Sequence, residues 1–195
     1  RGRSEHGRSE RSALAGLLRL ESHGSTSHHA TDIPSNICSS GRFAPVILHS
    51  RVGQRPEVST EGPQRQLTQC ATPELWGMLV SRVFAFPGVV EGHSQVSPAS
   101  SRAVFFEPDL PERMPETSLA PGQRLEPAHL HGVDDTSIHL CLPRDRAIAL
   151  VDLGWGQMHA YGDYGTELLI YGPRSDVELD IVLSIIEESL AFARG

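Results

Sequence analysis

The sequence predicts an α+β protein, in which an antiparallel sheet of four to six strands carries three helices packed mainly on one face. Short β-prone runs separated by turn residues fill most of the segment between residues 89 and 172. Apolar residues at helical spacing lie before, within and after that segment. Runs of strands with a few helices set among them are typical of α+β folds built on antiparallel sheets.

Helical spacing of apolar residues predicts three helices, over residues 73–86, 144–152 and 176–193. The first begins after Thr72, which can cap a helix, and Pro73 suits its first turn. The last begins after Ser175, and Glu178 stands three residues later, as in a capping box. The apolar stripe of this last helix consists of Leu179, Val182, Ile186 and Leu190. We expect these four side chains to be buried.

Period-two patterns and β-branched or aromatic residues predict the strands. They cover residues 93–97, 102–107, 128–131, 137–142 and 166–172, with 155–159 forming either another strand or a tight turn. The connection over residues 108–122 is rich in proline and long for a compact domain. We therefore expect it to act as a lid or a binding loop.

Composition divides the chain near residue 70. Residues 1–70 contain one aromatic residue, Phe43, and many Ser, Arg, Gly and Pro residues, so they cannot bury enough apolar surface to form a core. They are predicted to be a low-complexity, disordered N-terminal extension. The first methionine is Met78, and we expect the extension to lie outside the functional module. Residues 71–195 hold the other aromatic residues and are predicted to be the folded domain.

The charge of the predicted domain argues against binding to nucleic acid. Residues 71–195 carry eight arginines and eighteen acidic residues, a net charge of −10, whereas affinity for phosphate backbones comes from basic side chains. No apolar run approaches the roughly 20 residues of a membrane helix, no secretory signal opens the chain, and the three cysteines form no CxxC motif. We therefore expect a soluble, cytoplasmic protein that binds neither nucleic acid nor membranes.

Three histidines converge in a predicted hairpin. Alternate side chains of a strand share a face, so His129 and His131 point away from Leu130, and His139 in the next strand points away from Leu140. The apolar side chains of both strands share one core face only if residue 129 pairs with residue 139, which requires a turn of three or five residues. The pattern therefore predicts that the three histidines lie together on the other face.

This histidine face has three interpretations. Imidazoles from neighbouring strands can ligate Zn, Fe, Cu or Ni, and three nitrogens plus water form a common catalytic metal site. Asp134, Asp135 or His159 would then supply a fourth ligand. The face could instead line a metal-free binding or catalytic pocket for a small molecule, or be plain surface or packing. The cofactor is left open, with a divalent transition metal held by His129, His131 and His139 as one alternative.

Further candidates for a ligand site are more isolated. His93 follows a glycine in a turn, and Trp155 between two glycines is either a core residue or a ring that stacks on a ligand. Arg174 after a proline either binds an anion or caps a helix, and His159 is near enough in sequence to join the three histidines. Cys141 is predicted on the histidine face, where a neighbouring imidazole could activate its thiol.

Several ordered motifs together carry a family resemblance. They are FPGVVEGHS at 86–94, HLH at 129–131, SIHL at 137–140, LP at 142–143, GWG at 154–156 and YGPR at 171–174. With them, about residues 72–194 resemble the bacterial and fungal luciferase-domain family. The resemblance implies an oxygen-dependent, light-emitting oxidation. It also implies that the histidines, the Gly-Trp-Gly element and the Pro-Arg element belong to one site.

Three functions remain open from the sequence. The first is an enzyme that acts, by oxidation for example, on a small organic molecule at the histidine face. The second is a non-catalytic ligand-binding module with the same pocket. The third is a protein-interaction domain in which the histidine face is the interface. The oligomeric state does not follow from the sequence.

Overall fold

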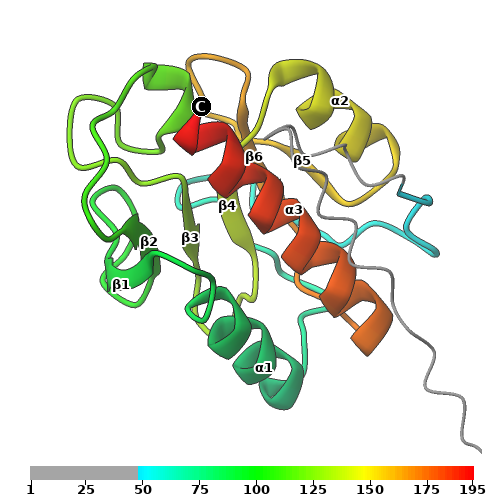
Figure 1. The fold of residues 1–195 in the computed structure, drawn as a ribbon. Helices are drawn as coiled ribbons and strands as arrows, with labels where there is room; N and C mark the ends of the chain where they lie inside the picture. The colour runs from blue at the N-terminus through cyan, green and yellow to red at the C-terminus, as the bar shows by residue number, and fades with distance from the viewer. Residues whose placement is uncertain (1–47) are drawn as a thin grey trace, which may run out of the picture. The chain divides into compact units, whose positions relative to one another are not determined.

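The computed structural model describes residues 48–195, and these form helices and strands in the predicted order (Figure 1). The helices are α1 (Pro73–Val83), α2 (Arg144–Asp152) and α3 (Asp176–Arg194), with a short 3-10 helix η1 (Pro115–Thr117). The strands are β1 (Val89–His93), β2 (Arg102–Phe106), β3 (Ala128–Leu130), β4 (Ile138–Cys141), β5 (Gly156–Met158) and β6 (Glu167–Ile170). Most of the predicted N-terminal extension, residues 1–47, lies outside the described residues.

The six strands form one sheet in the order β1-β2-β3-β4-β6-β5, and every neighbouring pair is antiparallel. Strand β6 follows β5 in the chain but lies between β5 and β4, so the hairpin β5-β6 adds to the sheet through its second strand. These pairings confirm the predicted α+β class and antiparallel sheet.

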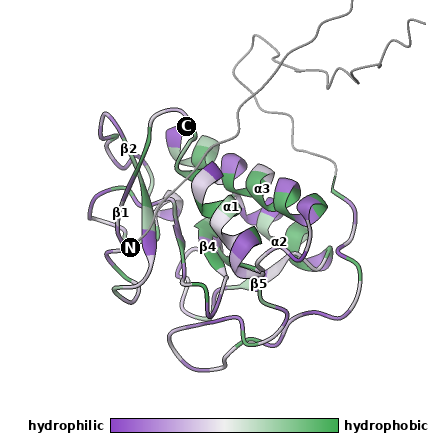
Figure 2. Ribbon diagram, turned by 90° about the horizontal axis from the view of Figure 1, so that it is seen from below, coloured by the Kyte–Doolittle hydropathy of each residue, from purple (hydrophilic) through white to green (hydrophobic). Residues whose placement is uncertain are grey.

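The helices share one hydrophobic core with one face of the sheet. Helices α1 and α3 pack on each other, and α3 crosses β3 and β4 (Figure 1). The predicted stripe of α3 is buried, which confirms that prediction: Leu179, Val182, Ile186 and Leu190 are all in the core. Along α1 and α3 hydrophobic and hydrophilic residues alternate, as expected of helices with one buried face (Figure 2).

Both predicted N-terminal caps are present. The hydroxyl oxygen of Thr72 accepts a hydrogen bond from the backbone N–H of Leu75 at 3.3 Å, at the start of α1. The hydroxyl oxygen of Ser175 accepts one from the N–H of Glu178, also at 3.3 Å, at the start of α3. Each cap satisfies a backbone donor that the first helical turn leaves without a partner.

The first strand lies earlier in the chain than predicted. The expected strand at 93–97 is wrong: β1 covers Val89–His93, and the chain turns back after it toward β2. Gly92 lies within β1, and the ring of Phe105 occupies the space that a side chain at this position would need. A Cβ atom built on Gly92 would lie 2.5 Å from that ring. Glycine inside a strand often marks such a close approach, which a sequence does not distinguish from a turn signal.

Residues 48–70 belong to the folded domain, so the predicted boundary at residue 70 is wrong for this part. The guanidinium of Arg51 is buried, donates to the carbonyl of Gly172 at 3.0 Å and pairs with the carboxylate of Glu178 at 3.0 Å. Gln64 and Gln66 are also buried. This segment has little apolar content, so polar contacts with distant residues hold it in place, and composition alone does not reveal them.

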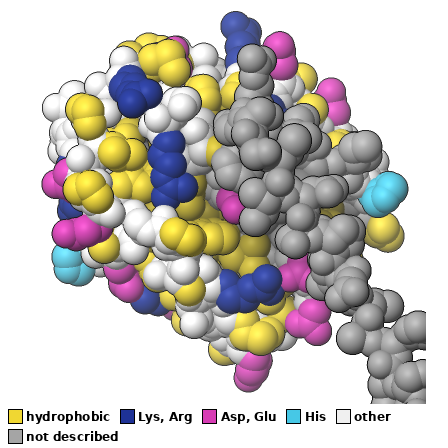
Figure 3. Space-filling view, viewed as in Figure 1, with side chains coloured by type: hydrophobic (Ala, Val, Ile, Leu, Met, Phe, Trp, Pro, Cys, Tyr) yellow, Lys and Arg dark blue, Asp and Glu magenta, His cyan; other side chains and the backbone are white. Residues whose placement is uncertain are grey.

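Figure 3 shows the helix side of the molecule, where charged and hydrophobic side chains are interspersed. In the part of this view that grey atoms do not cover, histidine side chains appear only singly, at the edge of the molecule. Among residues 48–195, no helix combines the length and the apolar character that crossing a membrane requires.

Candidate functional site

The hairpin β3-β4 has the predicted register. His129 pairs with His139, and the core residues Leu130 and Ile138 pair with each other. The backbone N–H of His131 donates to the carbonyl of Ser137 at 3.0 Å, so residues 132–136 form a five-residue turn. An odd turn unites the apolar side chains on the helix face of the sheet and therefore places the histidines on the opposite face.

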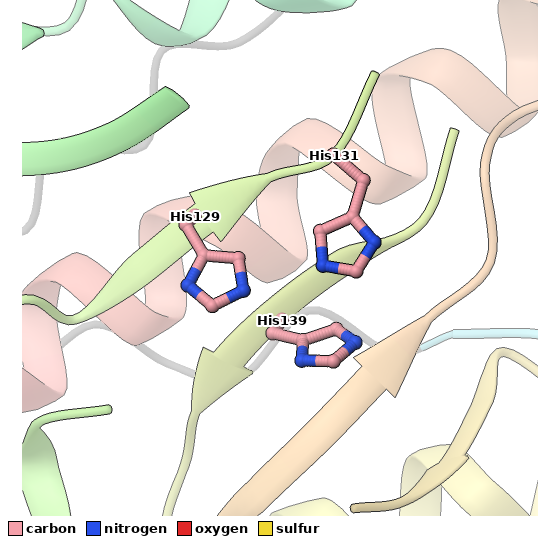
Figure 4. A group of neighbouring side chains, drawn as sticks. All are labelled: His129, His131 and His139. Carbon is pink, nitrogen blue, oxygen red and sulfur yellow. The ribbon is translucent and has the colours of Figure 1, made fainter. Parts of the chain in front are cut away.

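The three histidine rings lie against one another, and one nitrogen of each points toward the space between them (Figure 4). Ring centroids are 5.3 Å apart for His129 and His131, 5.0 Å for His129 and His139, and 4.5 Å for His131 and His139. The three residues are 2%, 4% and 3% exposed. His159, on the loop after β5, joins them with its ring 4.8 Å from that of His139. We name His129, His131 and His139 the histidine triad.

Glu126 fixes the ring of His129. Its Oε1 lies 2.9 Å from Nδ1 of His129 and accepts from the Ser94 hydroxyl at 2.6 Å, while Oε2 accepts from the N–H of Gln95 at 2.8 Å. Burial favours the neutral acid, but these hydrogen bonds outweigh it and hold the pKa of Glu126 below its usual value. The sequence did not reveal this fully buried carboxylate, whose only signal is its position three residues before His129.

Asp135 plays the same part for His131. One of its oxygens bonds to Nδ1 of His131, and the other accepts from the Ser137 hydroxyl at 2.6 Å and from the N–H of Gln66 at 2.8 Å. Although burial opposes ionisation, these contacts lower the pKa of Asp135. Asp135 is therefore occupied as a partner of a histidine, and its neighbour Asp134 is exposed on the turn.

The third histidine is fixed by a backbone group. Nε2 of His139 lies 3.2 Å from the carbonyl oxygen of Gln64, which can only accept. Gln64 belongs to the segment that the sequence assigned to the disordered extension, so sequence reasoning missed this contact too. Each triad ring thus has one nitrogen beside its own acceptor. The acceptors are the carboxylates of Glu126 and Asp135 and the backbone carbonyl of Gln64.

Burial shifts the pKa values of several groups in this cluster. It lowers the pKa of His129, and together with the neighbouring histidines it lowers that of His139 well below its usual value. Burial, followed by the proximity of His129 and His131, lowers the pKa of His159 to about 4. Burial, followed by Asp163 and Glu126, raises the pKa of Glu167 to about 7. Glu167 lies 3.1 Å from Nδ1 of His159 and can therefore accept or release a proton near neutral pH.

The histidines line a cavity of about 520 Å³, within the usual range for small-molecule sites. Its walls come from several loops and include Gln64, Ser97, Leu119, His159, Tyr161 and Glu167 beside the triad. Leu119 belongs to the connection at 108–122 for which we expected a binding role. Two other hollows have similar volumes, one by α1 and the start of α3 and one by β1. What distinguishes the histidine cavity is its chemistry.

Three predicted site residues lie elsewhere. His93 is exposed, and its pairing with Arg102, which pairs with Leu130, puts it on the helix face of the sheet. Trp155 is buried in the core and donates from Nε1 to the carbonyl of His49 at 2.9 Å. Arg174 bonds to Glu178, to the carbonyl of Val52 at 2.7 Å and to Gln69 at 2.8 Å.

These positions correct the inference that the motifs form one site. The side chain of Trp155 lies in the core and bonds to His49 of the segment 48–70. The side chain of Arg174 bonds to Val52 of the same segment and to Glu178. Both side chains therefore contribute to folding rather than to the histidine cavity. Cys141 is buried beside Glu167, and burial raises the pKa of its thiol, so it does not provide an activated nucleophile.

Comparisons with known proteins place the histidines of the cavity within a segment that matches a known family. The chain is an α+β domain with a histidine-lined cavity on the face of the sheet opposite its helices. The family model described as "Luciferase domain" matches residues 124–189, which contain the triad, Glu126, Asp135, His159 and Glu167. Over this segment the chain is similar to the luciferase-domain family.

Curated relatives are fungal proteins named luciferase. The luciferase of Armillaria gallica is 30% identical over 162 residues, which cover 74% of this chain and 60% of that protein. The luciferase of Neonothopanus nambi is 29% identical over 168 residues, with the same two shares. The match thus spans about 60% of the length of these relatives. No solved structure matches the chain.

Proposed function

We propose that this domain binds a small organic molecule in the histidine cavity and oxidises it with dioxygen. The observation that carries the proposal is that the titratable lining of the cavity lies within the segment matched by the luciferase domain. A luciferase couples the oxidation of an organic substrate to the emission of light. The relatives' name and the burial of the three histidines that line the cavity together support chemistry of this kind.

Glu167 is the group we assign to proton removal. Its pKa of about 7 gives comparable amounts of carboxylate and acid near neutral pH, which suits a general base. It lies in the cavity wall beside His159. The carboxylate takes a proton from a C–H group of the substrate, and the carbanion forms a C–O bond to dioxygen. The peroxide anion so formed takes the proton back as a hydroperoxide, so the electron pair of the C–H bond passes to dioxygen. The histidines exclude bulk water from the cavity and orient the substrate.

The same cavity would also serve a non-catalytic binding module. Its volume of about 520 Å³ is large enough to hold a small molecule, whether or not a reaction follows. In that case the chain would bind a ligand tightly without consuming oxygen, so binding and turnover have to be measured separately.

The test uses the full chain with the luciferin of the Armillaria luciferase, and that luciferase as the positive control. Oxygen uptake, light emission and binding are recorded together. We expect oxygen uptake that falls at least tenfold in Glu167→Gln and is unchanged in Glu187→Gln, which alters an exposed glutamate of α3. Binding without oxygen uptake would favour the binding module, and the absence of both would overturn the proposal.

A further inference from the structure

We propose that the histidine triad binds one divalent transition-metal ion, through one ring nitrogen each of His129, His131 and His139. The inference rests on the proposed function for its catalytic meaning, because the ion would lie in the wall of the same cavity. The binding itself follows from the arrangement of the three rings and of the acceptors that hold them.

His129 provides the strongest indication. Its Nδ1 faces the carboxylate of Glu126 at 2.9 Å, and that carboxylate also accepts from Ser94 and Gln95, so Nδ1 carries the proton. Nε2 therefore has a free lone pair. It is buried and has no hydrogen-bond partner among the described residues. A buried polar atom without a partner is costly, and a bound ion is one of its ordinary explanations.

His131 repeats the arrangement. Asp135 accepts from Nδ1, and Asp135 is itself held by Ser137 and by the backbone of Gln66. Nε2 of His131 is left with a lone pair. The hydroxyl of Ser97 lies 3.3 Å from this atom, a long contact, and that hydroxyl also lies 2.8 Å from the hydroxyl of Ser101.

His139 completes the set through its other nitrogen. The carbonyl of Gln64 accepts from Nε2, which leaves the lone pair on Nδ1. The carboxylate of Glu167 is 4.0 Å from this atom, beyond hydrogen-bond distance. Histidines that ligate metals almost always donate their other ring N–H to a carboxylate or a backbone carbonyl. Here two carboxylates and one carbonyl fill that role.

The triad is compact enough for one ion. One ring nitrogen of each of the three residues lies within 4.8 Å of the others. In a tetrahedral site with metal–nitrogen bonds near 2.05 Å, the nitrogens would be about 3.4 Å apart. Small rotations of the rings close the difference. The fourth position would then open toward the cavity, where it can hold water, dioxygen or the substrate.

The ligand atoms select the class of ion. Neutral imidazoles suit Zn, Fe, Co, Ni or Cu, whereas Mg and Ca prefer oxygen ligands. A neighbouring group, His139 with His159 and Glu167, also gathers three donor atoms within 4.8 Å. In that group Nδ1 of His159 lies 3.1 Å from Glu167 and accepts from the backbone N–H of Tyr161, and no buried nitrogen is left without a partner among the described residues. We therefore place the ion in the triad.

The test measures metal binding by the purified full chain without an affinity tag. After removal of metals with a chelator, the protein is dialysed against Zn²⁺ or Co²⁺ and its metal content is determined. We expect one ion per chain in a tight site, and Co²⁺ absorption bands typical of low-coordinate nitrogen sites. His129→Ala and His131→Ala should each weaken binding at least 100-fold. His93→Ala changes an exposed histidine on the other face and should leave it unchanged.

A second pair of variants tests the acceptors. Glu126→Gln and Asp135→Asn keep the size of the side chains, and loss of such partners typically costs about 10–100-fold in metal affinity.

Unfolded variants would be recognised by circular dichroism. A measurement on the unaltered protein then replaces them: in nitrogen NMR of labelled histidine, Zn²⁺ should shift the Nε2 signals of His129 and His131 and the Nδ1 signal of His139.

The outcomes separate this inference from the proposed function. Absence of a tight site, or unchanged affinity in His129→Ala and His131→Ala, would overturn the metal site. Loss of binding in His159→Ala alone would place the ion in the neighbouring group and equally overturn it. Metal binding without oxygen uptake would leave the metal site standing and remove the proposed oxidation. Oxygen uptake by a chain that binds no metal would do the reverse.

Discussion

The backbone N–H of Gln66 donates a 2.8 Å hydrogen bond to Asp135, the carboxylate that also bonds to His131. A segment with no strand or helix of its own thereby holds one ring of the triad. Gln64, two residues earlier, bonds to His139. The segment 48–70 therefore acts on the site as well as on the stability of the domain.

Truncation should reveal this role. A chain beginning at residue 71 lacks the bonds that Arg51, Gln64 and Gln66 make to the domain, whereas a chain beginning at residue 48 keeps them. We expect the shorter chain to have a clearly lower melting temperature and at least tenfold weaker binding at the histidine cavity. Thermal unfolding followed by circular dichroism compares the two. Equal melting temperatures would show that residues 48–70 contribute nothing to stability.

A substitution in the core should lower the stability of the protein and leave binding in the histidine cavity intact. Leu140 is fully buried on the helix face of β4, so Leu140→Ala should cost about 2–5 kcal/mol in the free energy of unfolding. Any ligand or metal binding should be retained below the lowered melting temperature, because the cavity lies on the other face of the sheet. Urea unfolding and binding measured on the same sample check both effects. A stable variant that had lost binding would contradict this division between the two faces.

Two glycines should give opposite effects when replaced by alanine. A Cβ atom on Gly156 would lie 2.2 Å from the backbone oxygen of Leu169 in the neighbouring strand, so Gly156→Ala should cost about 1–3 kcal/mol or more. Gly77 lies within α1 with nothing within 4 Å of the added atom, so Gly77→Ala should stabilise by about 1 kcal/mol. Denaturant unfolding of both variants would show the difference, and a neutral Gly156→Ala would contradict the close strand contact.

Acid should weaken the attachment of the segment 48–70. Burial alone would raise the pKa of Glu178, but hydrogen bonds from Arg174 and Arg51 outweigh it and lower that pKa. A carboxyl group with a depressed folded-state pKa stabilises the protein above its ordinary value of 4.5, and this stabilisation is lost as the pH falls through the folded-state pKa.

The comparison of Glu178→Gln with the unaltered protein measures this contribution. The difference in their free energies of unfolding should be largest near neutral pH and should shrink as the pH falls below 4.5. Glu187→Gln, on the exposed side of the same helix, is the matched control and should show no such trend. A difference that is independent of pH would mean that the charge of Glu178 is not what stabilises the segment.

The α+β class, the order of the elements and the register of the hairpin β3-β4 follow from the sequence alone. Its power came from periodicity: alternating side chains fix which residues share a face, and only one parity of register gives a single core face. The convergence of His129, His131 and His139 followed from that argument alone. The stripe of α3 was equally readable, because helical spacing is a local property of the chain.

What surrounds the triad depends on the tertiary structure. Glu126, Gln64 and Gln66 lie on loops without periodicity. Gln64 and Gln66 bond to His139 and Asp135, which are 75 and 69 residues further along the chain. The same limit explains why Trp155 and Arg174 were assigned to the site. A motif shows that a side chain has a role, but not which partner it meets. That choice depends on which segments the folded chain brings together, and no short stretch of sequence contains it.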